Sequence, residues 1–218
     1  MRLYLLRHGE VSSHQGDVPI TRAAERQAYE AGRRLAGEAA EPLRILTGET
    51  RRAVDTAAHL ARGVVDAGGR VVGPEVAFAL RNPDLYLSGV RVNMVSSTAA
   101  FAEQVEGVAA EDVAALDFFP EFIASPDRIG WWLTLESPPG EDAAALAQRV
   151  RAFATSLADP VPGRENTVVA VTHSPLIRAA GLDFLGEDIG EPPWVTGLLA
   201  TVDDDGAIRA EVYEERDR

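Results

Sequence analysis

An arginine, a histidine and a glycine, Arg7-His8-Gly9, stand directly after an apolar run, Leu3–Leu6, whose composition is typical of a buried strand. In α/β proteins, ligands bind at the carboxyl ends of the central strands. The three residue types suit an anionic ligand, because arginine neutralises charge, histidine can act as a nucleophile or an acid, and glycine lets the backbone turn close to the ligand. Taken alone, the triplet is also compatible with a strand that merely ends in a charged pair.

Two arginines, Arg51 and Arg52, form a second group with the same chemistry. They follow another short apolar run, Leu43–Leu46, and fall in the first turn of a predicted helix. The positive end of the helix dipole disfavours cations there, whereas a bound anion turns that cost into an advantage. A solvated pair of arginines is the alternative.

A second histidine, His173, ends the clearest strand pattern of the chain, Thr167–Thr172. Ser174 is a typical N-cap, and Pro175 suits the first position of a helix that runs toward Leu185. The N-terminal amides of that helix would point at whatever His173 faces. A histidine that only completes the packing at a strand end is the alternative.

The chain alternates short apolar runs with amphipathic segments, which predicts an α/β fold. The expected strands cover residues 3–6, 43–46, 71–78 and 167–172, with a closing hairpin over 194–202 and 207–213; the expected helices cover 21–38, about 51–64, 141–157 and 176–185. We expect a three-layer α/β/α fold with a mostly parallel central sheet. Since the carboxyl ends of parallel strands share one edge, Arg7, His8, Arg52 and His173 can converge on one pocket.

Length and composition narrow the class of protein. We expect the 218 residues to form a single domain. No apolar run approaches the roughly 18 residues of a membrane span, and the N-terminus lacks the apolar stretch of a secretory signal, so we expect a cytoplasmic protein with no membrane partner. The sequence has no cysteine and no lysine, which excludes thiol catalysis, the lysine-bearing phosphate loop and Schiff-base chemistry. A formal net charge of −13 argues against nucleic acid as a partner, and a phosphorylated ligand would need a local cluster of arginines.

The alternation stops between about residues 85 and 140, which we expect to form a mostly helical cap inserted over one end of the sheet. One helix is predicted near Ser97–Leu116. Trp131 and Trp132 are predicted to pack between this insertion and the rest of the protein, and a wall of the substrate pocket is the alternative for them.

Four motifs together resemble the histidine phosphatase superfamily, in its phosphoglycerate mutase-like branch. In chain order they are Leu6-Arg7-His8-Gly9-Glu10; Asp17-Val18-Pro19-Ile20-Thr21 with Gln27-Ala28; Arg52-Ala53-Val54-Asp55-Thr56-Ala57; and Val171-Thr172-His173-Ser174-Pro175 followed by Ile177-Arg178. The resemblance covers both ends of the chain in the right order and leaves about 85–140 unmatched. It implies a phosphoglycerate mutase-like fold and a small phosphorylated substrate.

The resemblance also implies a role for each matching residue. His8 would take the phosphoryl group as phosphohistidine, while Arg7, Arg52 and His173 would hold the phosphoryl oxygens as charge develops in the transition state. A neutral imidazole nitrogen can attack phosphorus in line, and arginine forks match phosphate oxygens. The anion that His173 would face favours its protonated form. No metal and no cofactor is implied, and the sequence has no recognisable set of metal ligands.

Several positions depart from the family pattern. Asn82 stands where the family usually has a glutamate that protonates the leaving group, and an amide cannot donate a titrating proton. Asp84 is a candidate substitute for that acid, and Arg81 is a candidate for substrate binding. Ser174 replaces a usual glycine, although its backbone amide is still available. His14 stands where the family often has a substrate-contacting asparagine, which makes it a further candidate.

The sequence therefore predicts a phosphomonoester hydrolase that acts through a phosphohistidine on His8. A phosphoglycerate mutase, which returns the phosphoryl group to its substrate, is the nearest alternative. A phosphoryl-binding protein that has lost turnover is an alternative of another class, favoured by the missing glutamate and disfavoured by the intact arginines and histidines.

Overall fold

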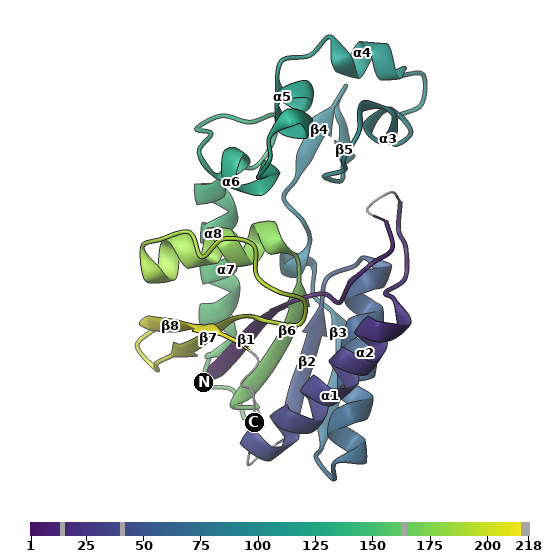
Figure 1. The fold of residues 1–218 in the computed structure, drawn as a ribbon. Coiled ribbons are helices and arrows are strands. Elements are labelled where there is room, and N and C mark those ends of the chain that lie inside the picture. Colours follow the sequence, from purple (N-terminus) through teal and green to yellow (C-terminus); the bar gives the residue numbers. More distant parts are fainter. Residues whose placement is uncertain (14–15, 40–41, 163–164, 215–218) are drawn as a thin grey trace.

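The computed structural model describes residues 1–218 except 14–15, 40–41, 163–164 and 215–218 (Figure 1). A six-stranded sheet lies at the centre, in the order β3 (Val71–Val76), β2 (Leu43–Thr47), β6 (Thr167–Thr172), β1 (Arg2–Arg7), β7 (Gly197–Val202) and β8 (Ile208–Tyr213). The first four are parallel neighbours, and the hairpin of β7 and β8 adds to β1 in antiparallel fashion. The expected mostly parallel α/β sheet is confirmed.

Helices cover both faces of this sheet. They are α1 (Arg22–Glu38) and α2 (Arg51–Asp66) on one face and α7 (Ala143–Leu157) and α8 (Ser174–Leu185) on the other. Alternate residues of β1 point into the hydrophobic cores on the two faces of the sheet. Leu3 and Leu5 pack with α7 and α8, whereas Tyr4 and Leu6 pack with α1 and α2. Burial on both faces therefore explains why the strand reads as a continuous apolar run.

The start of α1 and its contact with α2 follow from single residues. The Thr21 hydroxyl caps α1 by accepting a hydrogen bond from the Ala24 amide at 3.2 Å. The two helices approach so closely that a Cβ at Gly63 would lie 2.0 Å from the Tyr29 carbonyl oxygen. This contact fixes α2 against α1, and a hydrogen bond from the Gly9 amide to the Thr56 hydroxyl holds the N-terminal half of α2 beside the end of β1.

We call residues 85–140 the cap. It contains the strands β4 (Leu85–Leu87) and β5 (Val90–Val92) and the helices α3 (Thr98–Ala102), α4 (Ala110–Ala114), α5 (Phe118–Ala124) and α6 (Arg128–Leu133); a short 3-10 helix, η1 (Phe78–Leu80), precedes it. The expectation of one helix near Ser97–Leu116 is wrong, because the chain turns at Gly107, whose φ of 78° is left-handed, and so forms two short helices. Figure 1 shows the cap above the edge where β1, β2 and β6 end.

Aromatic side chains form the interior of the cap. Trp132 is fully buried in a cluster that continues into α7 and α8, and Trp131 lies 5.5 Å from Phe118 between ring centroids. Neither tryptophan lines the pocket described below, so the packing interpretation is confirmed. Across the described part of the chain, no helix is long and apolar enough to cross a membrane.

Candidate active site

A pocket of about 390 Å³ lies between the cap and the carboxyl ends of the parallel strands. It brings together six of the residues singled out from the sequence, which are Arg7, His8, Arg52, Asn82, His173 and Ser174. The remaining lining residues are Met94, Val95, Ser96, Phe122, Pro126, Asp127, Arg128, Ile129, Pro175 and Glu191. Most of the added residues come from the cap, so the cap supplies one wall of the pocket.

The imidazole of His8 has its two nitrogens in different environments. Nδ1 lies 2.8 Å from the Gly9 carbonyl oxygen, and Nε2 lies 3.2 Å from Nε of Arg52. Because the arginine can only donate, Nε2 must accept and the ring proton must be on Nδ1, where it is donated to the carbonyl. This arrangement leaves an unprotonated Nε2 in the pocket, as an attack on phosphorus requires.

Gly9 is required for a reason that the sequence did not indicate. Its amide donates to the Thr56 hydroxyl at 2.9 Å, and a Cβ at this position would lie 2.8 Å from the Cβ of Ala24. The glycine therefore allows the loop after β1 to pack against α1.

Arg7 is held by the segment Glu191–Trp194 rather than by its sequence neighbours. Its Nη1 donates to the Pro192 carbonyl at 2.7 Å, its Nη2 lies 2.6 Å from Oε1 of Glu191, and its guanidinium lies 3.4 Å from the ring centre of Trp194. Burial lowers the pKa of Arg7 to about 10 against the opposing effect of Glu191, so the side chain is cationic at neutral pH. In the sequence, this segment could be noticed because Glu191 precedes two rigid residues, Pro192 and Pro193.

The two arginines at the start of α2 separate. Arg52 is half-buried in the pocket, and burial lowers its pKa from the usual value, partly offset by the charge of Asp17. The Arg51 side chain is 58% exposed and lies 3.7 Å from Asp55, which confirms the solvated interpretation for this residue. The Arg51 amide donates to Oδ1 of Asp17 at 2.7 Å, so that carboxylate satisfies one amide at the helix N-terminus.

His173 is buried beside His8, with 5.3 Å between the ring centroids and 3.4 Å from its Nε2 to the Thr50 hydroxyl. Burial, followed by the positive charge of Arg52, lowers the pKa of His173 well below its usual value. The ring is therefore neutral at pH 7 in the ligand-free pocket. The protonated form expected from the sequence needs the charge of a bound anion.

Arg81 and Asp84 do not line this pocket. Both oxygens of Asp84 accept from Arg81, at 3.0 and 2.5 Å, and Oδ1 also accepts from Arg91 at 2.5 Å. These hydrogen bonds, the one from Arg81 first, lower the pKa of Asp84. A carboxylate stabilised in this way is a poor proton donor, which argues against the expectation that Asp84 is the acid and that Arg81 binds substrate.

The loop before the cap explains why Asn82 and Asp84 diverge. Arg149 of α7 donates to the carbonyls of Ala79, Arg81 and Asn82 at 3.1–3.3 Å, which fixes the path of the loop. Asn82 is buried on the pocket side, as its alignment with the family glutamate predicts, whereas Asp84 turns toward the arginines. His14 lies outside the described residues.

Arg178 joins the cap to the loop after α8. It is 1% exposed, and it contacts both oxygens of Asp127 at 2.7 Å and both oxygens of Asp188 at 2.9 and 2.6 Å. Burial acts to lower the pKa of Arg178, but these hydrogen bonds raise it overall. Arg178 belongs to the second-histidine motif, but nothing in the sequence paired it with Asp127.

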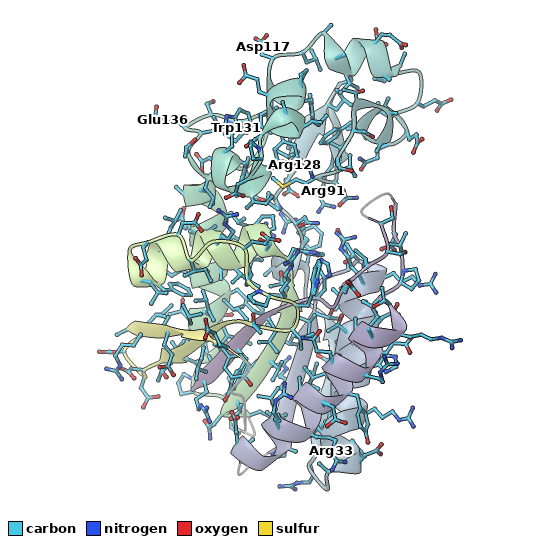
Figure 2. The ribbon with its side chains drawn as sticks, viewed as in Figure 1. Arg33, Arg91, Asp117, Arg128, Trp131 and Glu136 are labelled. Atoms are coloured by element: carbon cyan, nitrogen blue, oxygen red, sulfur yellow. The ribbon has the colours of Figure 1, made fainter. Side chains whose placement is uncertain are left out.

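Figure 2 shows Arg128 and Arg91 on the side of the cap that faces the sheet.

The arrangement suits one tetrahedral anion. Two guanidiniums and two imidazoles from three separate junctions share the pocket, and arginine forks bind phosphate oxygens well. Among the residues that the structure describes, no group of three or more histidine, aspartate or glutamate side chains could hold a metal ion.

Comparisons with known proteins identify the family and the fold. The sequence profile of the histidine phosphatase superfamily (branch 1) matches residues 3–67 and 108–202. A search of curated proteins finds no match. Solved structures with a similar fold include a mycobacterial glucosyl-3-phosphoglycerate phosphatase in complex with VO3, which is 23% identical, with a TM-score of 0.60 and coverage of 97% of this chain and 96% of that one.

Two further structures have a TM-score of 0.60 at 16% identity and cover 97% of this chain. One is a phosphoglycerate mutase from Bacillus anthracis, with 91% of its chain covered, and the other is a mutant phosphoserine phosphatase from Entamoeba histolytica in complex with phosphoserine, with 95% covered. At these identities the likeness establishes the fold alone.

Proposed function

Because the chain belongs to the histidine phosphatase superfamily, we propose that it hydrolyses phosphomonoesters through a phosphohistidine on His8. The observation that carries the proposal is the state of His8, whose unprotonated Nε2 lies in the pocket 3.2 Å from Arg52. In this proposal Nε2 attacks phosphorus, and Arg7, Arg52 and His173 stabilise the charge on the phosphoryl oxygens.

The substrate in this proposal is a small phosphorylated metabolite, which fits the cytoplasmic location expected from the sequence. A cavity of about 390 Å³ accommodates a phosphoryl group together with a small organic group. Its upper wall combines apolar side chains, Met94 and Phe122 among them, with the cation Arg128. Arg128 suits a second anionic group, so phosphorylated carboxylic acids belong in the first set of compounds to be screened.

The test is to trap the intermediate. The protein is mixed with a radiolabelled phosphomonoester and quenched in alkali, where phosphohistidine survives, or in acid, where it is lost. We expect an alkali-stable label in the wild type and none in His8→Gln, whose turnover of 4-nitrophenyl phosphate falls by about a thousandfold or more. His59→Gln on α2 is the matched control, because this half-buried histidine lies outside the pocket, and it should keep the label.

Three results would contradict the hydrolase. Turnover that is unchanged in His8→Gln would remove the phosphohistidine. Conversion of 3-phosphoglycerate into 2-phosphoglycerate, faster than release of phosphate, would make the protein a mutase. Binding of phosphate with no turnover of any ester would indicate a phosphoryl-binding protein.

A further inference from the structure

The proposed reaction needs a proton for the leaving group, and Asn82 at the family's acid position cannot provide one. Expulsion of an alkoxide is slow unless a positioned acid protonates it, and such an acid contributes about a hundredfold or more. Asp84 is held by two arginines outside the pocket. Among the described residues, two carboxyl groups line the pocket, those of Asp127 and Glu191.

The carboxylate of Asp127 has a structural role. Both of its oxygens are bound by Arg178 at 2.7 Å, and Oδ1 also accepts from the Gly130 amide at 2.9 Å. The hydrogen bonds from Arg178, as the largest cause, lower the pKa of Asp127 to about 2. This carboxyl group carries no proton at neutral pH and is not the acid.

Glu191 also contacts arginine, but only one of its oxygens lies within hydrogen-bond distance of a guanidinium. Its Oε1 lies 2.6 Å from Nη2 of Arg7, while its Oε2 accepts from the Ser174 hydroxyl and lies 3.8 Å from Nη1 of Arg178. Its side chain is 47% exposed, which gives it access to protons from water. The following Pro192 accepts from Nη1 of the same arginine at 2.7 Å and keeps the glutamate beside it.

Binding of substrate changes the partners of Glu191. Arg7 and Arg52 line the pocket as cations, and Arg128 of the cap lines it as well. A phosphomonoester carries close to two negative charges at neutral pH. Its phosphoryl oxygens need the guanidinium that Oε1 of Glu191 contacts, so a bound substrate displaces the glutamate from Arg7 and leaves this exposed carboxyl group within the pocket.

We propose that Glu191 is the catalytic acid that replaces the missing family glutamate; this rests on the proposed function. Nε2 of His8 bonds to phosphorus as the bond from phosphorus to the leaving oxygen breaks. The electron pair of that bond stays on the leaving oxygen, which takes the proton of the Glu191 carboxyl. Water then attacks the phosphohistidine and gives a proton to the Glu191 carboxylate, while the electrons of the phosphorus–nitrogen bond return to His8.

The test measures turnover of substituted phenyl phosphates, from the nitrophenyl ester, whose leaving group needs no proton, to the methoxyphenyl ester, whose leaving group does. We expect Glu191→Gln to slow the methoxyphenyl ester by about a hundredfold and the nitrophenyl ester only a few-fold. The rates of Glu191→Asp should lie between those of the wild type and those of Glu191→Gln. Glu187→Gln is the matched control, since it is an exposed glutamate on the same loop outside the pocket, and it should behave as the wild type.

The nitrophenyl ester also reports folding, because its turnover should still depend on His8 in each variant. Equal slowing of all esters in Glu191→Gln would overturn the role of Glu191 as the acid. Unchanged rates with tighter inhibition by vanadate would also overturn it, since Glu191 would then only compete with anions for Arg7. Absence of phosphohistidine in the wild type is a different failure, which would remove the proposed function itself.

Discussion

Two parts of the pocket differ in how the chain builds them. The floor consists of Arg7, His8, Arg52 and His173, which come from the ends of β1 and β6 and the start of α2. The rim consists of the cap and the loop at residues 186–196, which meet at Arg178. The backbone of the floor is positioned by strand pairing in the sheet, whereas the rim is positioned by side-chain contacts, which include apolar packing and the ion pairs of Arg178.

This difference separates the part of the pocket that the sheet fixes from the part that can vary. Strand pairing fixes the floor tightly, because Arg7 lies opposite Thr172 in the register of β1 and β6 and brings the two histidine junctions side by side. Contacts such as the one between Arg178 and Asp127 join positions 51 residues apart and can vary without changing the sheet. We infer that the floor determines the phosphoryl chemistry and that the rim determines substrate and proton transfer.

Replacing a floor cation should have the largest effect. Arg52→Ala removes a half-buried guanidinium that contacts His8, and we expect kcat/KM for an aryl phosphate to fall by about a thousandfold. Its neighbour Arg51 has the same charge but is exposed, so Arg51→Ala should change kcat/KM by less than about threefold. Similar losses in both variants would mean that overall positive charge, and not the floor, controls the reaction.

Replacing the buried cation of the rim should come next. Arg178→Met keeps the apolar volume but leaves Asp127 and Asp188 without their partner, and we expect a loss of about 3 kcal/mol in the free energy of unfolding, measured with urea. Arg62→Met is the control, because that side chain is 72% exposed in a surface pair with Asp66 and should change stability by less than about 0.5 kcal/mol. A loss below about 1 kcal/mol for Arg178→Met would show that other contacts hold the rim.

The same contrast explains what the sequence could predict. Floor residues lie at the boundary between an apolar strand and a helix, so local patterns located Arg7, Arg52 and His173 and the sheet that joins them. Their roles in catalysis are still predictions. The helix-start pattern alone offers Arg51 and Arg52 equally. The family resemblance assigns the phosphate-binding role to Arg52 and leaves Arg51 as a solvated neighbour, and helix geometry turns Arg51 toward solvent and Arg52 into the pocket.

The rim could not be predicted, because its pattern is not local. Asn82 and Asp84 are two positions apart, yet only the contacts of Arg149 and Arg91 show that one faces the pocket and the other does not. In the sequence, nothing distinguishes Glu191 from other loop residues, and only the fold places it beside Arg7. Long-range ion pairs of this kind have no periodicity from which to infer them.

A smaller effect is expected in the pH dependence of the free energy of unfolding, through the ion pair between Asp127 and Arg178 in the rim. Hydrogen bonds from Arg178 lower the pKa of Asp127 from 3.8 to about 2. Since the folded pKa is the lower one, this stabilisation is complete above pH 3.8 and disappears as the pH falls through 2. Solvent screening of a side chain that is 60% exposed reduces it to about 1 kcal/mol. Urea unfolding of wild type and Asp127→Asn should therefore differ most above pH 4 and converge on acidification, whereas a constant difference would disprove the link.

The smallest effect is expected for Asp84→Asn, a change that lies between floor and rim and belongs to neither. Asp84 supports Arg81 and Arg91, and an asparagine oxygen can still accept from one of them. We expect all phenyl phosphates to slow by the same small factor, no more than about threefold and far below the roughly hundredfold loss that follows removal of a general acid. The ratio of nitrophenyl to methoxyphenyl turnover is the measurement, with Glu191→Gln assayed in parallel. A selective loss of the methoxyphenyl ester in Asp84→Asn would return the role of acid to Asp84, and the loop before the cap would then have to move toward the floor when substrate binds.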